Sequence, residues 1–445
     1  MKRDLTSGNI ISDLLTFAGP MIIGNLLQQI YNIADTLIVG RCLGEDALAA
    51  VGSTYTLTTF LYSIIIGLCM GSGALVSYCY GEKNRKRLRS SMSISFVFIG
   101  TIAVAAEIIT LCITSDILKL LKTPPEIMAI IGDYVKIILS GIVFIFLYNF
   151  YAYMLRSFGN SVTPLIFLGA ASVINIVLDI VFVSFMDFGV KGAAYATLIA
   201  QAISGIGLAL YSVLKERELR IKPSDIKFNK KEVLTVVRMS SAASLQQSVM
   251  NFGILMIQGL VNSFGTTVMA AFTVAVKIDT LAYMPAQEFG NAFSMFVSQN
   301  YGAKKNDRIK ECVKKSFQIS GAFCIVVSEI VVVFSKNLMR IFVSADETQI
   351  IATGAQYLVT EGAFYVGIGL LFLLYGYYRG INKPEMSLIL TIISLGTRVV
   401  LAYILSGFET IGVFGIWIAI PIGWILADIT GCIYMKKCIR TDNNL

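Results

Sequence analysis

The sequence contains no histidine and few charged residues. Of its 445 residues only 14% are charged, whereas 56% are hydrophobic, and the mean hydropathy is +0.74. Soluble domains carry about 25% charged residues, so this composition excludes an ordinary water-soluble enzyme. Disorder is excluded as well, because disordered chains are rich in charge and poor in apolar residues. The class that remains is a polytopic membrane protein.

Several chemical motifs are also missing. The eight cysteines stand singly, without a C-x-x-C pair, so neither a zinc site nor a disulfide framework is predicted. The chain has no G-x-x-x-x-G-K-[ST] loop, which argues against ATP-driven pumping. Without histidine, and without a nucleophile–base or metal constellation, the chain is predicted not to be an enzyme.

What the sequence does contain is a series of long apolar segments. A helix needs about 20 mostly apolar residues to cross a bilayer. Twelve segments meet this requirement: 14–39, 52–79, 93–114, 130–154, 163–186, 192–214, 239–263, 268–299, 316–335, 352–378, 386–406 and 411–435. They predict an all-α integral membrane protein with twelve transmembrane helices. The polar first residues, MKRDLTSGNI, predict no cleavable signal peptide.

The basic residues predict how the chain is oriented. If the two termini and the even-to-odd connections share one side, that side holds 27 of the 36 lysines and arginines. The other side holds 7, and Lys277 and Arg398 lie within spans. This bias predicts a multi-pass protein of the cell (inner) membrane with both termini in the cytoplasm. The basic runs are interpreted as topology determinants and not as nucleic-acid contacts.

The two halves of the chain resemble each other at an offset near 220 residues. Leu-Gln-Gln at 27–29 recurs at 245–247, Tyr80-Gly81 recurs as Tyr301-Gly302, and Tyr134 corresponds to Tyr357. The repeat predicts a six-helix lobe over 1–214, a basic cytoplasmic linker over 215–238 and a second six-helix lobe over 239–445. An even number of spans per repeat implies a pseudo-twofold axis along the membrane normal. This architecture favours a secondary transporter with alternating access over a channel.

Polar residues of the first lobe form the main candidate site. Asp35, Asn175, Asp179 and Thr197 lie within roughly 6–11 Å of the outer ends of their spans, at 1.5 Å per residue. The repeat places glycine and apolar residues at the equivalent positions of the other lobe. Ionisable groups inside a membrane are functional candidates, and oxygen ligands of this kind suit Na⁺ or a shared proton. The alternative interpretation is that Asn175, Asp179 and Thr197 are interhelical hydrogen-bonding residues.

A substrate cavity is predicted beside these acids. Gln28, Tyr31 and Asp35 are spaced i, i+3, i+7 and share one helix face, and Asn149 of the fourth span is expected to join them. The aromatic ring of Tyr31 either lines this cavity or packs in the core. In the second lobe, Glu288 either recognises a cationic substrate or neutralises a neighbouring charge.

The other charged residues within spans are interpreted as structural. Glu107 and Glu329 occupy equivalent positions in the two repeats, which suits a structural role. Asp279 is expected to pair with Lys277 or with Arg398. The same role is expected for Asp428.

Several segments in order resemble the multidrug and toxic compound extrusion (MATE) transporters over essentially the full chain. The resemblance rests on Gly19-Pro20 with Asn-Ile-Ala-Asp35-Thr downstream, Leu155-Arg156-Ser-Phe-Gly159-Asn160, Asn175-x-x-x-Asp179, Tyr301-Gly302-Ala303 and Tyr378-Arg379-Gly380. It implies an exporter of amphipathic, often cationic organic compounds, driven by inward H⁺ or Na⁺ movement. No cofactor is implied apart from the coupling ion, and we expect small-molecule substrates, a lipid bilayer environment and a monomer.

The resemblance also implies where the coupling ion binds. One branch of the family has its cation site in the first lobe, and its pattern maps onto Asp35, Asn175, Asp179 and Thr197. A second branch uses acids of spans 7 and 10, and this chain departs from it, because span 10 has no acid after Glu361. A cation site of that kind is therefore not expected in the second lobe.

Two other transporter classes share a related architecture. A lipid-linked saccharide flippase is the first alternative, but it would favour more basic residues inside the membrane than the two present. A major-facilitator-type symporter is the second, and the loop after span 2 lacks the run G-x-x-x-D-R-x-G.

Overall fold

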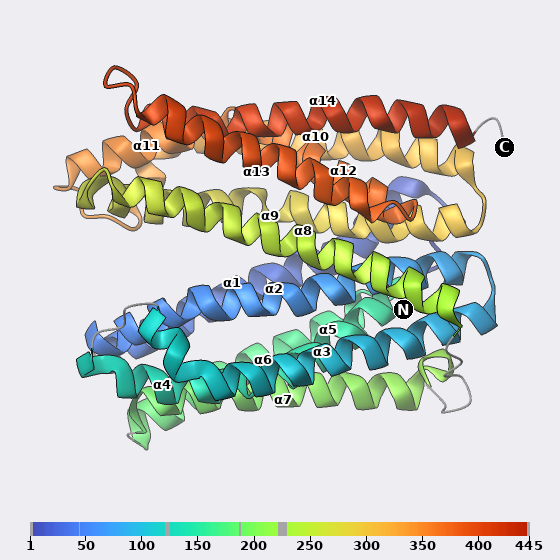
Figure 1. Cartoon of the computed structure of the whole chain (residues 1–445), viewed down its shortest axis with the longest axis horizontal. Coiled ribbons are helices and arrows are strands. Elements are labelled where there is room, and N and C mark those ends of the chain that lie inside the picture. Colours follow the sequence, from blue (N-terminus) through green and yellow to red (C-terminus); the bar gives the residue numbers. More distant parts are fainter. Residues whose placement is uncertain (1–2, 44, 121–124, 187, 221–228, 443–445) are drawn as a thin grey trace. The chain divides into compact units, whose positions relative to one another are not determined.

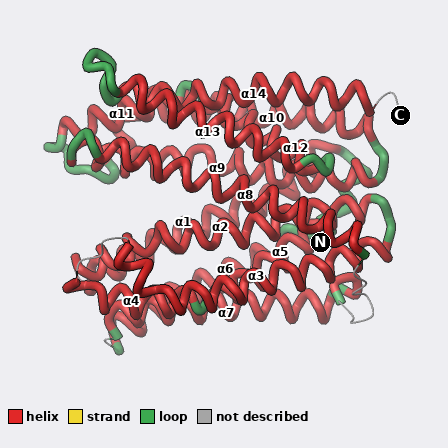
Figure 2. Tube along the Cα trace, viewed as in Figure 1, coloured by secondary structure: helices red, strands yellow, loops and turns green. Residues whose placement is uncertain are grey.

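The computed structural model describes residues 3–43, 45–120, 125–186, 188–220 and 229–442. Residues 221–228 of the predicted linker lie outside this description. Within the described ranges every regular element is a helix (Figure 2). The all-α class predicted from hydropathy is therefore confirmed.

The helices divide between two compact units. The first unit comprises Met1–Asp4 and Gly19–Ser244, and the second comprises Leu5–Ala18 and Leu245–Leu445. Within each unit the long helices run roughly parallel or antiparallel (Figure 1). The elements are α1 (Ile10–Leu43), α2 (Glu45–Gly81), α3 (Arg85–Leu120), α4 (Pro125–Leu139), α5 (Ile142–Ser157), α6 (Val162–Asp179), η1 (Ile180–Phe185), α7 (Gly189–Lys215), η2 (Arg217–Leu219), α8 (Lys230–Asn262), α9 (Thr266–Gly302), α10 (Asn306–Arg340), α11 (Thr348–Gly362), α12 (Tyr365–Gly380), α13 (Pro384–Ser406) and α14 (Phe414–Asp442).

Each of the twelve predicted spans corresponds to one helix or to one interrupted helix. Among the described residues, ten helical segments are long and apolar enough to cross a membrane, and the bent pair α11 and α12 makes an eleventh. The remaining span is α8, whose first half is rich in serine and glutamine and therefore less apolar than the others. The chain is a multi-pass membrane protein with six spans in each half.

Three of the predicted spans are interrupted, which the hydropathy pattern did not indicate. The fourth span breaks between α4 and α5, where Glu107 Oε2 of α3 accepts a hydrogen bond from the backbone N–H of Val143 at 3.0 Å. The fifth span changes from α-helix to a π-helical turn at Ile180, directly after Asp179. The tenth span bends by 53° between α11 and α12. Glu107 thus caps one free N–H group at this break, in agreement with its predicted structural role.

The internal repeat is visible in the backbone conformation. Lys83 and Lys304 follow equivalent helix ends, and both adopt the left-handed region, with φ of 58° and 57°. Gly189 and Gly412 form a second such pair, with φ of 57° and 51°, where the sixth and twelfth spans begin. Non-glycine residues rarely adopt this conformation, so its recurrence supports a common fold for the two halves.

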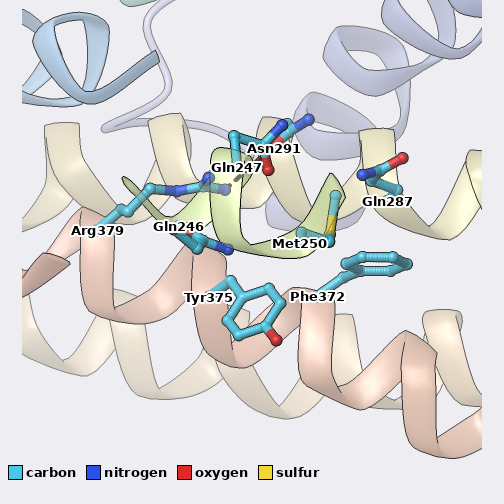
Figure 3. A pocket seen from close by; sticks show the side chains of 8 residues that line it. All are labelled: Gln246, Gln247, Met250, Gln287, Asn291, Phe372, Tyr375 and Arg379. Atoms are coloured by element: carbon cyan, nitrogen blue, oxygen red, sulfur yellow. Dashed lines mark hydrogen bonds between the residues drawn. The ribbon is translucent and has the colours of Figure 1, made fainter. Parts of the chain in front are cut away.

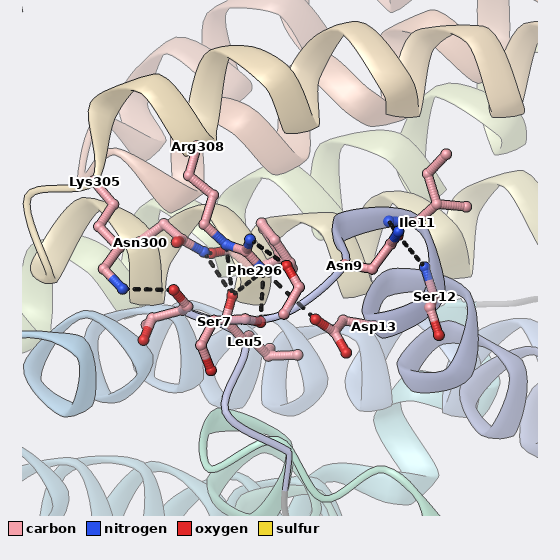
Figure 4. Close-up of polar contacts among 12 residues, drawn as sticks. Leu5, Ser7, Asn9, Ile11, Ser12, Asp13, Phe296, Asn300, Lys305 and Arg308 are labelled. Carbon is pink, nitrogen blue, oxygen red and sulfur yellow. Dashed lines mark hydrogen bonds and ion pairs between the residues drawn. The ribbon is translucent and has the colours of Figure 1, made fainter.

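The N-terminal segment is fixed to the second unit by polar contacts (Figure 4). Arg308 of α10 donates hydrogen bonds to backbone carbonyls within residues 5–8, and its guanidinium pairs with Asp13 at 3.5 Å. The Asn300 amide donates to the Leu5 carbonyl at 3.0 Å, and the Leu5 side chain is fully buried. These contacts hold the residues that precede and begin α1.

Candidate functional site

The four predicted first-lobe residues come from three helices of the first unit. Asp35 lies on α1, Asn175 and Asp179 end α6, and Thr197 lies on α7. Asn175 Nδ2 donates a hydrogen bond to Thr197 Oγ1 at 3.3 Å, and the charge of Asp179 interacts with that of Asp35. Asp179 is completely buried and Asn175 is 2% exposed, while Asp35 is half-buried. The structure therefore brings all four residues into one region of the unit.

Several oxygens of this cluster have no hydrogen-bond partner among the described residues. They are both Oδ atoms of Asp179, Oδ1 of Asn175 and Oδ1 of Asp35, and each is buried. A buried carboxylate without a partner is costly unless it binds a proton or a cation. The oxygens thus form an acceptor set that a proton or a small hard cation would satisfy.

Three tyrosines belong to the surroundings of the two acids. Tyr134 of α4 is 6% exposed, and it interacts electrostatically with Asp35, Asp179, Tyr62 and Tyr31. Tyr134 and Asp179 are both buried, and burial strengthens the charge interactions inside the cluster. Among the described residues no group of three or more His, Cys, Asp or Glu side chains is placed to hold a metal ion. Two carboxylates with neutral oxygens suit a monovalent cation better than a transition metal.

The residues predicted for a substrate cavity are found in different surroundings. Tyr31 is half-buried in the neighbourhood of the acids, whereas Gln28 is exposed on the same helix. Asn149 Nδ2 donates to the Ile145 carbonyl of its own helix at 2.9 Å. In the second unit, Glu288 Oε1 accepts a hydrogen bond from Asn291 at 3.2 Å. The role of these four residues in substrate binding stays a prediction.

The second unit contains a buried charge cluster that the sequence did not reveal as a group. Asp279 of α9 is 4% exposed and Glu361 of α11 is 1% exposed, and the two acids line the same cavity and interact electrostatically. Tyr365 donates a hydrogen bond of 2.7 Å to Asp279 Oδ1, and the charge of Arg398 on α13 acts on both acids. We call Asp279, Glu361, Arg398 and Tyr365 the second-unit charge cluster.

This cluster shows which of the two expected partners, Lys277 or Arg398, lies near Asp279. Asp279 does not contact Lys277, because the Lys277 side chain is exposed on another face of α9. The expected proximity of Asp279 to Arg398 is present. The helix α11 ends at Gly362, directly after Glu361, and the chain turns there with Glu361 buried inside the unit. The sequence gives a single signal for this cluster, which is that Asp279, Glu361 and Arg398 all lie within predicted spans.

A cavity of about 80 Å³ borders the charge cluster. Asp279, Glu361 and Arg398 line it together with aromatic and methionine side chains, among them Met250, Tyr283, Phe372 and Trp424. A smaller pocket adjoins it and shares Met250, Gln287, Phe372 and Tyr375. Figure 3 shows this pocket, where amide side chains from α8 and α9 face Arg379 of α12. The second unit thus contains two neighbouring pockets, one lined by the charge cluster and one rich in amide side chains.

Arg379 and Glu288 belong to one polar chain at the amide-rich end. Arg379 donates to Asn291 Oδ1 at 2.9 Å, and Asn291 in turn donates to Glu288. Glu288 is therefore connected to a buried arginine through one amide. Both predicted roles of Glu288, recognition of a cationic substrate and neutralisation of a neighbouring charge, stay predictions.

Comparisons with known proteins agree with the repeat and with the fold. A family model described as MatE matches residues 20–181 and, a second time, residues 242–404. The chain is 30% identical to the "Probable multidrug resistance protein YpnP" of Bacillus subtilis, over 97% of this chain and 96% of that protein. It is 26% identical to the "Probable multidrug resistance protein NorM" of Thermotoga maritima, over 94% and 90% of the two chains.

Solved structures show the same fold. A crystal structure of MATE in complex with MaL6 superimposes with a TM-score of 0.93 at 24% identity, and 99% of each chain is covered. An outward-facing multidrug resistance MATE transporter gives a TM-score of 0.92 at 25% identity, covering 98% of each chain. The names of the relatives, which are probable multidrug resistance proteins, do not favour a lipid-linked saccharide flippase.

Proposed function

Since the chain belongs to the MatE family of membrane transporters and is not an enzyme, we propose that it is a cation-coupled multidrug exporter. In this function it exchanges amphipathic, often cationic organic compounds for H⁺ or Na⁺. The names of its relatives support drug export: YpnP and NorM are called probable multidrug resistance proteins. The proposal places both termini in the cytoplasm, because of the distribution of lysine and arginine, and a monomer as the working unit.

The observation that carries the coupling proposal is the first-unit cluster of Asp35, Asn175, Asp179 and Thr197. It combines two carboxylates with an amide and a hydroxyl, and several of its buried oxygens lack hydrogen-bond partners among the described residues. A proton or Na⁺ that enters from outside would satisfy these oxygens and cancel part of the negative charge. The cluster is then filled in one state and open in another, as a coupling site requires.

The proposed cycle is competitive. A cation bound between Asp35 and Asp179 draws α1 toward α6, and the π-helical turn directly after Asp179 lets the end of α6 adjust. This change disfavours the substrate beside Tyr31, which leaves outward. Movement of the cation to the inside then resets the carrier for the next substrate.

The proposal is tested with purified protein in liposomes of defined orientation. A fluorescent organic cation is loaded, and either a pH gradient or a Na⁺ gradient is imposed alone. The expected result is export that follows one of the two gradients and stops when both are collapsed. Export of the fluorescent cation that continues unchanged without either gradient would contradict a coupled exporter.

A further inference from the structure

One face of α9 carries a series of polar side chains that lies outside the coupling site. Positions spaced alternately four and three apart share one face of a helix. On α9 these positions hold Thr273, Lys277, Thr280, Met284, Gln287 and Asn291, and all but Met284 are polar. We call these residues the α9 polar face. At 1.5 Å per residue it is about 27 Å long, which is close to the thickness of the hydrocarbon layer.

The α9 polar face differs from a helix surface that contacts lipid. On α13 the exposed side chains between positions 386 and 404 are aliphatic, aromatic or glycine: Ile389, Ile392, Gly396, Val400, Tyr403 and Ile404. On α9, by contrast, the exposed residues of the polar face are Thr273 and Lys277. A charged side chain in contact with hydrocarbon is unfavourable, and such residues face protein or a water-filled space. The exposed end of the α9 polar face therefore faces water.

The threonines of this face do not donate hydrogen bonds to other helices. Thr273 Oγ1 donates to the Met269 carbonyl at 2.8 Å, and Thr280 Oγ1 donates to the Val276 carbonyl at 2.7 Å. Both acceptors belong to α9 itself. Each threonine has one hydroxyl proton, so interhelical donation does not explain why polar residues stand here.

Lys277 is the charged residue of the exposed end. In the register that aligns Tyr80 with Tyr301, position 277 corresponds to Thr56, so the fold shared by the two halves does not require a lysine there. Among the described residues no acid forms an ion pair with Lys277. The ammonium group is therefore available to a ligand.

The other end of the α9 polar face leads to the pockets of the second unit. Gln287 lines both pockets, and Asn291 lines the smaller one (Figure 3). Asn291 is hydrogen-bonded to Arg379 and to Glu288, which bring one charge of each sign to this end. The face thus runs from a single positive charge in water to a polar pocket wall of mixed charge.

We propose that Lys277 binds the carboxylate of amphipathic substrates that carry both a positive and a negative charge. The proposal rests on the proposed export function and names a residue that determines which compounds the carrier accepts. An ammonium group offers three donors and a full charge to a carboxylate. The same group repels a compound whose only charge is positive. Lys277 therefore favours zwitterions over cations of the same shape, in a reversible step without covalent chemistry.

Two rhodamine dyes isolate the contribution of the carboxylate. Tetramethylrhodamine is a zwitterion at neutral pH, and its methyl ester keeps the cationic ring system without the negative charge. Binding of each dye to purified protein in detergent is measured by fluorescence anisotropy, with protein-free micelles as the blank. The unmodified protein is expected to bind both dyes, and the ratio of the two Kd values reports its charge preference.

The variants change the charge at position 277 alone. Lys277→Gln should raise the Kd of tetramethylrhodamine about fivefold, as expected for the loss of an accessible ion pair, and should leave the Kd of the ester unchanged or lower it. Lys277→Arg keeps the charge and should keep the preference. Lys336→Gln, at an exposed lysine of α10, is the matched control and should change neither Kd.

The outcomes separate this inference from the proposed function. The assignment of Lys277 is overturned if tetramethylrhodamine does not bind the unmodified protein, if Lys277→Gln changes the two Kd values equally or not at all, or if Lys336→Gln has the same effect. Gradient-driven export of the methyl ester can persist in each of these cases. Conversely, charge-selective binding together with gradient-independent movement in liposomes would overturn coupled export and leave the role of Lys277 standing.

Discussion

The hydroxyl of Tyr365 offers a direct test of the energetics of the second-unit charge cluster. Its hydrogen bond to Asp279 Oδ1 is 2.7 Å long, and both side chains are buried. Tyr365→Phe removes the hydroxyl and leaves the ring in place. A hydrogen bond to a charged group contributes about 1.5–3 kcal/mol, so the unfolding equilibrium should shift by roughly 10- to 150-fold toward the unfolded state.

The assay is equilibrium unfolding in mixed detergent micelles, followed by tryptophan fluorescence. Tyr403→Phe is the matched control, because Tyr403 on α13 is 53% exposed, and little change is expected there. The double variant Tyr365→Phe with Asp279→Asn should lose less stability than the sum of the two single changes, since the same hydrogen bond is removed by both. Equal stability of Tyr365→Phe and the Tyr403 control, or strict additivity with Asp279→Asn, would refute the reasoning.

Two further predictions concern packing and capping. Gly290→Ala should lower the free energy of unfolding by about 1–3 kcal/mol, because an added Cβ would lie 2.8 Å from a backbone oxygen of α12. Gly321→Ala is the control, because no atom lies within 4 Å of the added Cβ, and it should be neutral or stabilising in the same unfolding assay. Glu107→Ala should lower the free energy of unfolding by about 0.5–2 kcal/mol, because it removes the cap on Val143. Glu329→Ala, at the equivalent position of the repeat, should leave this free energy unchanged. Equal losses in the two glutamate variants would contradict the capping role.

The sequence predicted the number and approximate limits of the spans because hydropathy depends on composition alone. It did not predict the break before Val143, since the residues on both sides of that break are equally apolar. It did not predict the turn after Gly362 either, since the turn lies within one predicted span. Such breaks depend on partners from other helices, as the Glu107 cap shows.

The polar sites also include contacts that the local sequence predicted and contacts that it did not. Asn175 and Asp179 share a helix face by spacing alone, so local periodicity predicted their proximity, and the contact of Asn175 with Thr197 is present. Asp279 and Glu361 line the same cavity although they are more than 80 positions apart in the sequence. No local pattern encodes such a contact, and only the packing of the second unit reveals it.

The most direct measurement of the central claim is ion-driven export by the Asp35→Asn variant. Purified Asp35→Asn and unmodified protein are placed in liposomes at equal density, and export of a fluorescent cation is recorded under the gradient that drives the unmodified protein. Asn keeps the size of the side chain and removes its charge, so we expect at least a tenfold loss of gradient-driven export, with folding checked by unfolding in detergent. Export by Asp35→Asn at the unmodified rate, still dependent on the gradient, would contradict coupling through the first-unit acids.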